Sequence, residues 1–237
     1  MKVRYLTGMM IATLLMGCGD DDGGKTNDNF SNCDVDPTLH ETAKVESADP
    51  DGVTLDPAIF PFGVQAGDMQ PSSAILWSYA SDDLDKTLRV WRYLDSGEVA
   101  VVHDATVMAV EGYLKTSVSG LAPGYWYHYA FFDGAAPSWS RRSKIGRFRT
   151  AFADECDAPL TVAGTHGTNF RFMPYKALQV TAREEPDVFI QLGDMSYNDG
   201  AETLEDFRAF WHETLEDPGY AALLPSVGQY ITWDDHE

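Results

Sequence analysis

The sequence predicts two folded parts in series, an all-β sandwich followed by an incomplete α/β domain. Short apolar runs separated by turn residues fill residues 54–152, which is the pattern of a β-sandwich. Strands and amphipathic helices alternate over residues 153–237, which is the pattern of a parallel sheet. Two apolar runs in this second part stop in carboxylates, as strands do at the ligand-binding edge of an open α/β sheet.

Residues 1–18 have the features of an export signal. Lys2 and Arg4 precede an apolar run, residues 5–16, that is too short to span a bilayer. The run leads into Leu15-Met16-Gly17-Cys18, which resembles a bacterial lipobox, where the signal is cut before a lipidated cysteine. The alternatives are an ordinary secretory signal and an uncleaved anchor. We predict an exported protein that a lipid on Cys18 anchors to a bacterial membrane, on its periplasmic or cell-surface face.

Residues 19–53 form a polar, acidic stretch that buries too little apolar area to offset the entropy of ordering. We expect a disordered tether here. If Cys18 carries lipid, Cys33 and Cys156 remain, an even pair in an oxidising compartment. These two cysteines form either a disulfide, which would pin the tether to the start of the second domain, or two free thiols.

The charge balance limits the choice of partners. The chain has 37 acidic and 17 basic residues, a formal net charge of −20. This argues against a nucleic-acid-binding surface, which needs a basic footprint. It also argues against electrostatic docking on anionic lipid, so attachment to the membrane rests on the lipid anchor. We expect a monomer.

The sandwich is predicted from seven short strands with turn residues between them. In order, the expected strands are residues 74–78, 88–93, 99–102, 106–110, 114–118, 125–131 and 146–150. The run from Leu121 to Tyr129 resembles the tyrosine corner of fibronectin type III domains, in which a tyrosine hydroxyl bonds back to the preceding backbone. Its aromatic residues fit a sandwich core and domain interface; a carbohydrate platform is the alternative.

The second part is predicted as alternating strands and helices. Strands are expected at residues 160–164, 188–192 and 230–233, and a helix at 174–185. Thr203-Leu204-Glu205-Asp206 opens a further helix with the pattern of a capping box. The strands at 188–192 and 230–233 are apolar throughout, so we expect both to be fully buried in a parallel sheet.

Polar residues directly follow these two strands. Asp194 and Tyr197 come after the first, and Asp235 and His236 after the second. Because parallel strands end at the same sheet edge, these four side chains are expected to converge. Aspartate, tyrosinate and imidazole suit iron, manganese, zinc or calcium, so the sequence predicts a metal site.

Several motifs together resemble the PhoD-like alkaline phosphatases, a branch of the metallophosphoesterases. They are Phe62-Gly63-Val64-Gln65-Ala66-Gly67-Asp68, Ala74-Ile75-Leu76-Trp77, Leu192-Gly193-Asp194-Met195-Ser196-Tyr197, Thr203-Leu204-Glu205-Asp206-Phe207-Arg208 and Thr232-Trp233-Asp234-Asp235-His236-Glu237. The resemblance implies a β-sandwich ahead of a two-metal catalytic domain, with Fe³⁺ and Ca²⁺ as the expected ions and Zn²⁺ or Mn²⁺ as alternatives. It implies that Asp194 bridges the metals, Tyr197 binds the ferric ion and Asp235 binds the second metal. His236 would stabilise the transition state or protonate the leaving group.

Two features depart from this family. Where the family usually places a cysteine ligand, the chain has Thr165, followed by His166, which either replaces that ligand or is no ligand. The sequence also stops at Glu237, ahead of the strands that supply further histidine or aspartate ligands in metallophosphoesterases. We therefore expect part of a longer protein, not competent as a phosphatase by itself.

The leading hypothesis is an exported phosphomonoesterase or phosphodiesterase of the PhoD-like type, acting on a phosphate ester. The alternative is a non-catalytic surface lipoprotein whose fibronectin-like domain binds a partner. A nuclease or lipid phosphodiesterase on the same scaffold is a third possibility.

Overall fold

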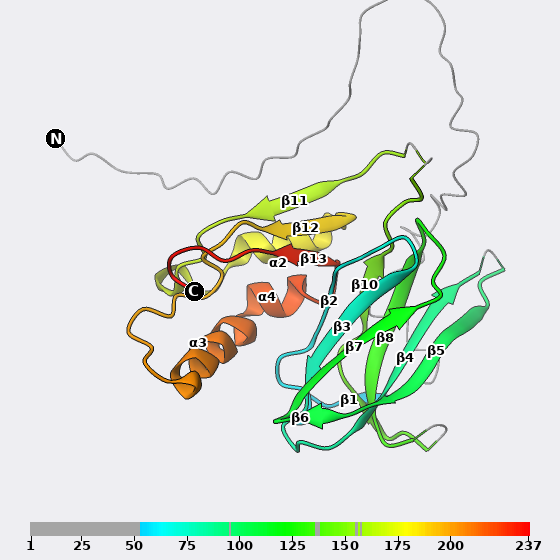
Figure 1. The fold of residues 1–237 in the computed structure, drawn as a ribbon, viewed down its shortest axis with the longest axis horizontal. Helices are drawn as coiled ribbons and strands as arrows, with labels where there is room; N and C mark the ends of the chain where they lie inside the picture. Colours follow the sequence, from blue (N-terminus) through cyan, green and yellow to red (C-terminus); the bar gives the residue numbers. More distant parts are fainter. Residues whose placement is uncertain (1–52, 95, 136–137, 155, 157) are drawn as a thin grey trace, which may run out of the picture.

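The computed structural model describes residues 53–94, 96–135, 138–154, 156 and 158–237 (Figure 1). The predicted signal, Cys18, Cys33 and almost all of the tether lie outside the described residues. Cys156 is disulfide-bonded; its pairing with Cys33 stays a prediction. None of the helices in the described part of the chain is long and apolar enough to cross a membrane.

The sandwich consists of two sheets facing each other across one core (Figure 1). The first sheet runs in the order β1 (Thr54–Leu55), β9 (Arg141–Arg142), β8 (Trp126–Asp133), β4 (Lys86–Tyr93) and β5 (Val99–Val107), and β10 (Gly146–Arg149) also pairs with β8. The sandwich strands of the second sheet are β2 (Val64–Gly67), β3 (Ser73–Tyr79), β7 (Tyr113–Ser119) and β6 (Ala109–Val110).

Alternation along the strands builds the sandwich core. In β3, every second residue is buried, including Ala74 and Leu76, as expected for a strand with one face on the core. These residues pack against Val90, Tyr129 and Phe148 of the opposite sheet. The predicted break between residues 102 and 106 is wrong, because residues 103–105 pair with β4 and β5 is one strand.

The second sheet continues from the sandwich into the rest of the chain. β11 (Val162–Thr165), β12 (Val188–Gln191) and β13 (Gln229–Ile231) pair in parallel, as the sequence predicted. β13 then pairs in parallel with β2 through Gln229 and Gly67. The strands of the second part therefore extend a sandwich sheet, and the two parts share hydrogen bonds as well as packing.

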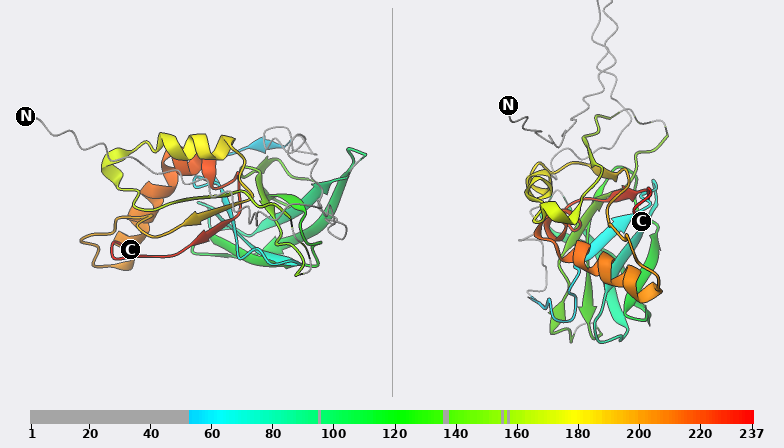
Figure 2. Two further views of the ribbon diagram at one scale, coloured as in Figure 1. Left: turned by 90° about the horizontal axis from the view of Figure 1, so that it is seen from above. Right: turned by 90° about the vertical axis from the view of Figure 1, so that its left-hand side faces the viewer.

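Helices cover one face of the parallel strands (Figures 1 and 2). They are η2 (Phe170–Phe172), α2 (Lys176–Arg183), α3 (Leu204–Glu216) and α4 (Pro218–Leu223). The predicted capping box is confirmed: the Thr203 side chain accepts from the Asp206 N–H, and the Asp206 carboxylate accepts from the Thr203 N–H. Proline at the start of α4 separates this helix from α3.

The prediction that β12 and β13 are fully buried is wrong. β12 alternates between buried and half-buried residues, and in β13 the side chains of Tyr230 and Ile231 are each 42% exposed. β13 also ends at Ile231, and Trp233 is 83% exposed. The helices cover only one face of these strands, where Phe189 packs against Leu178 and Leu223. Apolar composition alone does not reveal which face has a neighbour.

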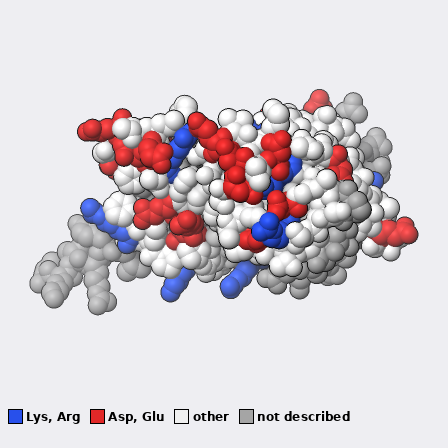
Figure 3. Space-filling model, turned by 90° about the horizontal axis from the view of Figure 1, so that it is seen from below, with Lys and Arg blue, Asp and Glu red and all other residues white. Residues whose placement is uncertain are grey.

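Acidic side chains are widespread on the surface. On the face in Figure 3, Asp and Glu extend across both parts of the molecule, and Lys and Arg occur in small groups between them. This distribution agrees with the net charge of −20.

The predicted tyrosine corner is present. The Ala122 backbone N–H donates to the Tyr127 hydroxyl oxygen at 2.8 Å, and the Tyr127 ring is buried in the core.

Tyr127→Phe removes this acceptor and leaves a part-buried N–H unpaired. We expect the free energy of unfolding to fall by about 1–3 kcal/mol, measured by urea denaturation.

Tyr125→Phe is the matched control, because its hydroxyl makes no hydrogen bond with the described residues and its ring, under Arg92, is kept. This change should alter stability by no more than about 0.5 kcal/mol. Equal effects of the two substitutions would show that the corner contributes nothing.

Candidate metal centre

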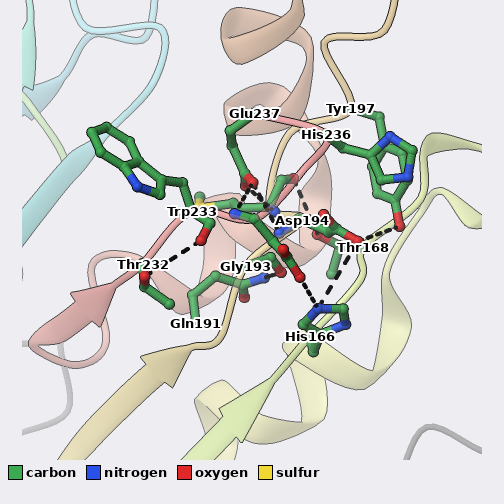
Figure 4. Close-up of polar contacts among 12 residues, drawn as sticks. His166, Thr168, Gln191, Gly193, Asp194, Tyr197, Thr232, Trp233, His236 and Glu237 are labelled. Atoms are coloured by element: carbon green, nitrogen blue, oxygen red, sulfur yellow. Dashed lines mark hydrogen bonds and ion pairs between the residues drawn. The ribbon is translucent and has the colours of Figure 1, made fainter.

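The loops that follow β11, β12 and β13 come together at one edge of the sheet (Figure 4). His166 follows β11, Asp194 follows β12, and residues 234–237 follow β13. The parallel pairing of the three strands places their carboxyl ends side by side. The site is therefore a direct result of the sheet topology.

Asp194 lies at the centre of this edge. It belongs to two groups of possible metal ligands, one with His166 and Asp234 and one with Asp235 and His236, and within each group the ligand atoms lie within 4.8 Å of one another. The residue is 6% exposed, and its Oδ1 has no hydrogen-bond partner. An unpaired buried carboxylate oxygen is unfavourable, so the donor set fits a bound cation.

The backbone at Asp194 is unusual for a residue with a side chain. Its φ is +54°, in the left-handed region that aspartate tolerates better than most residues. Strained backbone of this kind is concentrated at functional sites. Here it turns the chain sharply after β12, so that the carboxylate faces the other two loops.

His166 and Asp234 form one side of the site. His166 Nε2 lies 3.2 Å from Asp234 Oδ2 and 4.0 Å from Asp194 Oδ2. His166 thus reaches the cluster from the loop where the family resemblance places a cysteine, while Thr165 itself is buried at the end of β11. Sequence reasoning assigned no role to Asp234; its only signal was its position directly before Asp235.

Tyr197 and His236 form the other side of the site. The Tyr197 hydroxyl donates to Asp194 Oδ2 at 3.4 Å, and its ring lies 4.2 Å from the His236 ring, centroid to centroid. Burial, together with the nearby Asp194 carboxylate, raises the pKa of Tyr197. Both effects disfavour tyrosinate, and a bound cation would oppose them.

His236 is held by a carboxylate that sequence reasoning missed. Its Nδ1 lies 2.8 Å from Asp199 Oδ2. The hydrogen bond to Asp199, with the charge of that group and of Asp194 and Asp235, raises the pKa of His236. The shift in pKa is in the direction that a proton donor requires.

Glu237 connects the two loops by backbone hydrogen bonds. Its carboxylate accepts from the N–H groups of Asp194 at 3.1 Å, Met195 at 2.5 Å and Asp234 at 2.9 Å. Burial alone would raise the pKa of Glu237, but these N–H groups outweigh it and hold the pKa below its usual value. Glu237 therefore positions the loops, a role that the sequence did not indicate.

Gly193 allows the loops to approach closely. Its φ is +109°, and a Cβ there would lie 2.7 Å from the Asp234 Cβ.

Gly193→Ala should destabilise the fold by about 1–3 kcal/mol and displace Asp234, weakening metal binding. Urea denaturation and metal titration measure the two effects. Gly200→Ala is the control: φ is +84°, but nothing lies within 4 Å, so metal affinity should not change. Equal metal affinity in both variants would contradict this account.

Comparison with known proteins places this site in context. Residues 45–152 match the family model of the PhoD-like phosphatase, N-terminal domain. The solved structure of PhoD is 23% identical, with a TM-score of 0.65, over 76% of this chain and 39% of that chain. The FN5 domain of Drosophila Lar is 17% identical, with a TM-score of 0.32, over 38% of this chain and 92% of that domain. No curated protein matches the chain.

The match in sequence covers the sandwich, and the match in structure extends beyond it. The chain spans 39% of the length of the solved PhoD chain. The resemblance inferred from the motifs is confirmed: residues 45–152 match the N-terminal domain of PhoD-like phosphatases, and 76% of the chain shares its fold with part of PhoD.

Proposed function

We propose that the strand-end site is part of a two-metal centre that hydrolyses phosphate mono- or diesters in an exported, lipid-anchored protein. One observation carries the proposal: the buried Asp194 carboxylate belongs to both ligand groups, the position of a bridging ligand. The match of residues 45–152 to the N-terminal domain of PhoD-like phosphatases supports the reaction class.

The donor chemistry supports an assignment of ligands. Asp194, His166 and Tyr197 would hold a ferric ion, since a hard cation favours carboxylate and tyrosinate oxygen. Asp194 and Asp235 would hold Ca²⁺, with Zn²⁺ or Mn²⁺ as alternatives. Cations held by these residues would supply Lewis-acid stabilisation of the negative charge that develops on the phosphoryl group. Asp234 is an additional carboxylate beside His166.

The remaining residues supply proton transfer and positioning. His236, whose pKa the hydrogen bond to Asp199 raises, would donate its proton to the leaving oxygen of the ester or stabilise the charge on the transferred phosphoryl group. Glu237 would hold the Asp194 and Asp234 loops at a fixed separation through its backbone contacts. The roles of His236 and Glu237 both depend on the close approach of the loops that follow β12 and β13.

Elemental analysis of the purified chain tests the metal assignment without requiring turnover. We expect stoichiometric iron together with calcium, zinc or manganese. Loss of metal should not unfold the sandwich, whose core is separate from the site. A chain without bound metal under metal-replete conditions would favour the alternative of a non-catalytic surface lipoprotein, which the threonine at position 165 also favours.

A further inference from the structure

A cavity lies between the sandwich and the helices, away from the metal centre. Its volume is about 780 Å³. Its walls come from β1, the segment from β9 to β10, the end of α2 and the residues around α4. Arg183 and Glu185 precede β12, and Ser226 precedes β13, so the cavity lies toward the amino ends of these strands. The metal centre lies at their carboxyl ends.

The cavity is basic in an otherwise acidic protein. Four of its lining side chains are cationic, Arg142, Lys144, Arg147 and Arg183, and one is anionic, Glu185. This local balance is opposite in sign to the net charge of −20 for the whole chain. A concave surface lined by one sign of charge attracts ions of the other sign.

Ion pairs within the lining do not neutralise the positive charges of Lys144 and Arg183. Arg147 is buried, donates to the Ser226 carbonyl at 2.7 Å and pairs with Glu185 at 3.4 Å. This pair uses the only carboxylate among the described lining residues. Lys144 donates to the Ala221 carbonyl at 2.5 Å, and neither Lys144 nor Arg183 forms an ion pair with any residue that the structure describes. A carbonyl satisfies a donor of Lys144 without neutralising its charge.

Partial burial adds an energetic reason for an anionic ligand. Lys144 is half-buried, and burial lowers its pKa because the charged form loses contact with water. A charge placed in such a site is unfavourable unless a counter-charge accompanies it. An anion between Lys144 and Arg183 would supply that counter-charge.

The remaining walls suit an organic group. Leu55, Ile145, Ala182, Ala222 and Pro225 present apolar surface to the cavity. The volume lies within the range of about 300–1,000 Å³ that is typical of small-molecule sites. We propose that this cavity binds a small organic anion with at least two negative charges. Its charged groups lie against Lys144 and Arg183, and its apolar body lies against the other walls.

Calorimetric titration of the full chain with naphthalene disulfonate tests this proposal. The probe has an apolar body and two charges, and it is not a phosphate ester, so hydrolysis at the metal centre does not affect the result. We expect binding with Kd near or below about 1 mM that weakens as salt increases. Dihydroxynaphthalene, with the same ring system and no charge, should not bind.

Substitutions locate the binding. Lys144→Met and Arg183→Gln should each weaken binding by about tenfold. Lys176→Met is the matched control, because Lys176 is an exposed residue of α2 outside the lining. Arg183 is also exposed, so Arg183→Gln decides the question even if Lys144→Met fails to fold. No binding up to about 10 mM, equal affinity in all variants, or equal binding of the neutral probe would overturn the proposal.

Discussion

Asp194→Asn should abolish metal binding and ester hydrolysis while leaving the fold intact. The amide is nearly isosteric, and asparagine tolerates the left-handed backbone that Asp194 adopts at φ +54°. What changes is the charge of the one residue that belongs to both ligand groups. The loss should exceed the roughly 10- to 100-fold that follows removal of an outer-shell partner of a ligand.

Two measurements separate metal loss from activity loss. Elemental analysis of the variant measures metal content, and cleavage of nitrophenyl phosphate measures hydrolysis. Asp83→Asn is a matched control, because Asp83 has nearly the same φ, +51°, but lies in the sandwich. Normal metal content in Asp194→Asn would remove the bridging role, and an unchanged rate of hydrolysis would remove the catalytic assignment.

Local signals in the sequence predicted the parts of this structure that local chemistry determines. The capping box at Thr203 and the tyrosine corner at Tyr127 depend on residues three to five positions apart, Asp206 and Ala122 respectively. The convergence of Asp194 and Asp235 followed from two strands that end in carboxylates, because parallel pairing brings such ends together.

Contacts between distant segments could not be predicted in the same way. His166 meets Asp234, and His236 meets Asp199, through loops whose paths no periodicity fixes. Glu237 acts through backbone N–H groups, which have no sequence signature at all. The exposed face of β13 was missed because apolar composition reports the tendency to be buried, not the presence of a neighbour.

Asp187→Ala should cause the largest loss of stability, about 3–5 kcal/mol. Arg149 at the end of β10 pairs with Asp187, directly before β12, at 2.6 Å, and both side chains are almost fully buried. The other Asp187 oxygen accepts from the Thr161 N–H at 2.7 Å. The substitution thus leaves a buried guanidinium without its counter-charge and a backbone donor without its acceptor. Urea denaturation measures the cost.

The partly exposed pair of Arg89 and Asp104, which lie 2.8 Å apart, provides the control. Asp104→Ala should cost no more than about 1 kcal/mol, because water replaces the lost partner. Replacing both buried residues together, with Arg149→Met and Asp187→Leu, should recover much of the loss, since no unpaired charge then remains. If Asp187→Ala costs no more than Asp104→Ala, the pair does not join the two parts. A large cost within one cooperative transition would mean that the sandwich and the strands carrying the metal centre unfold together, as the shared sheet requires.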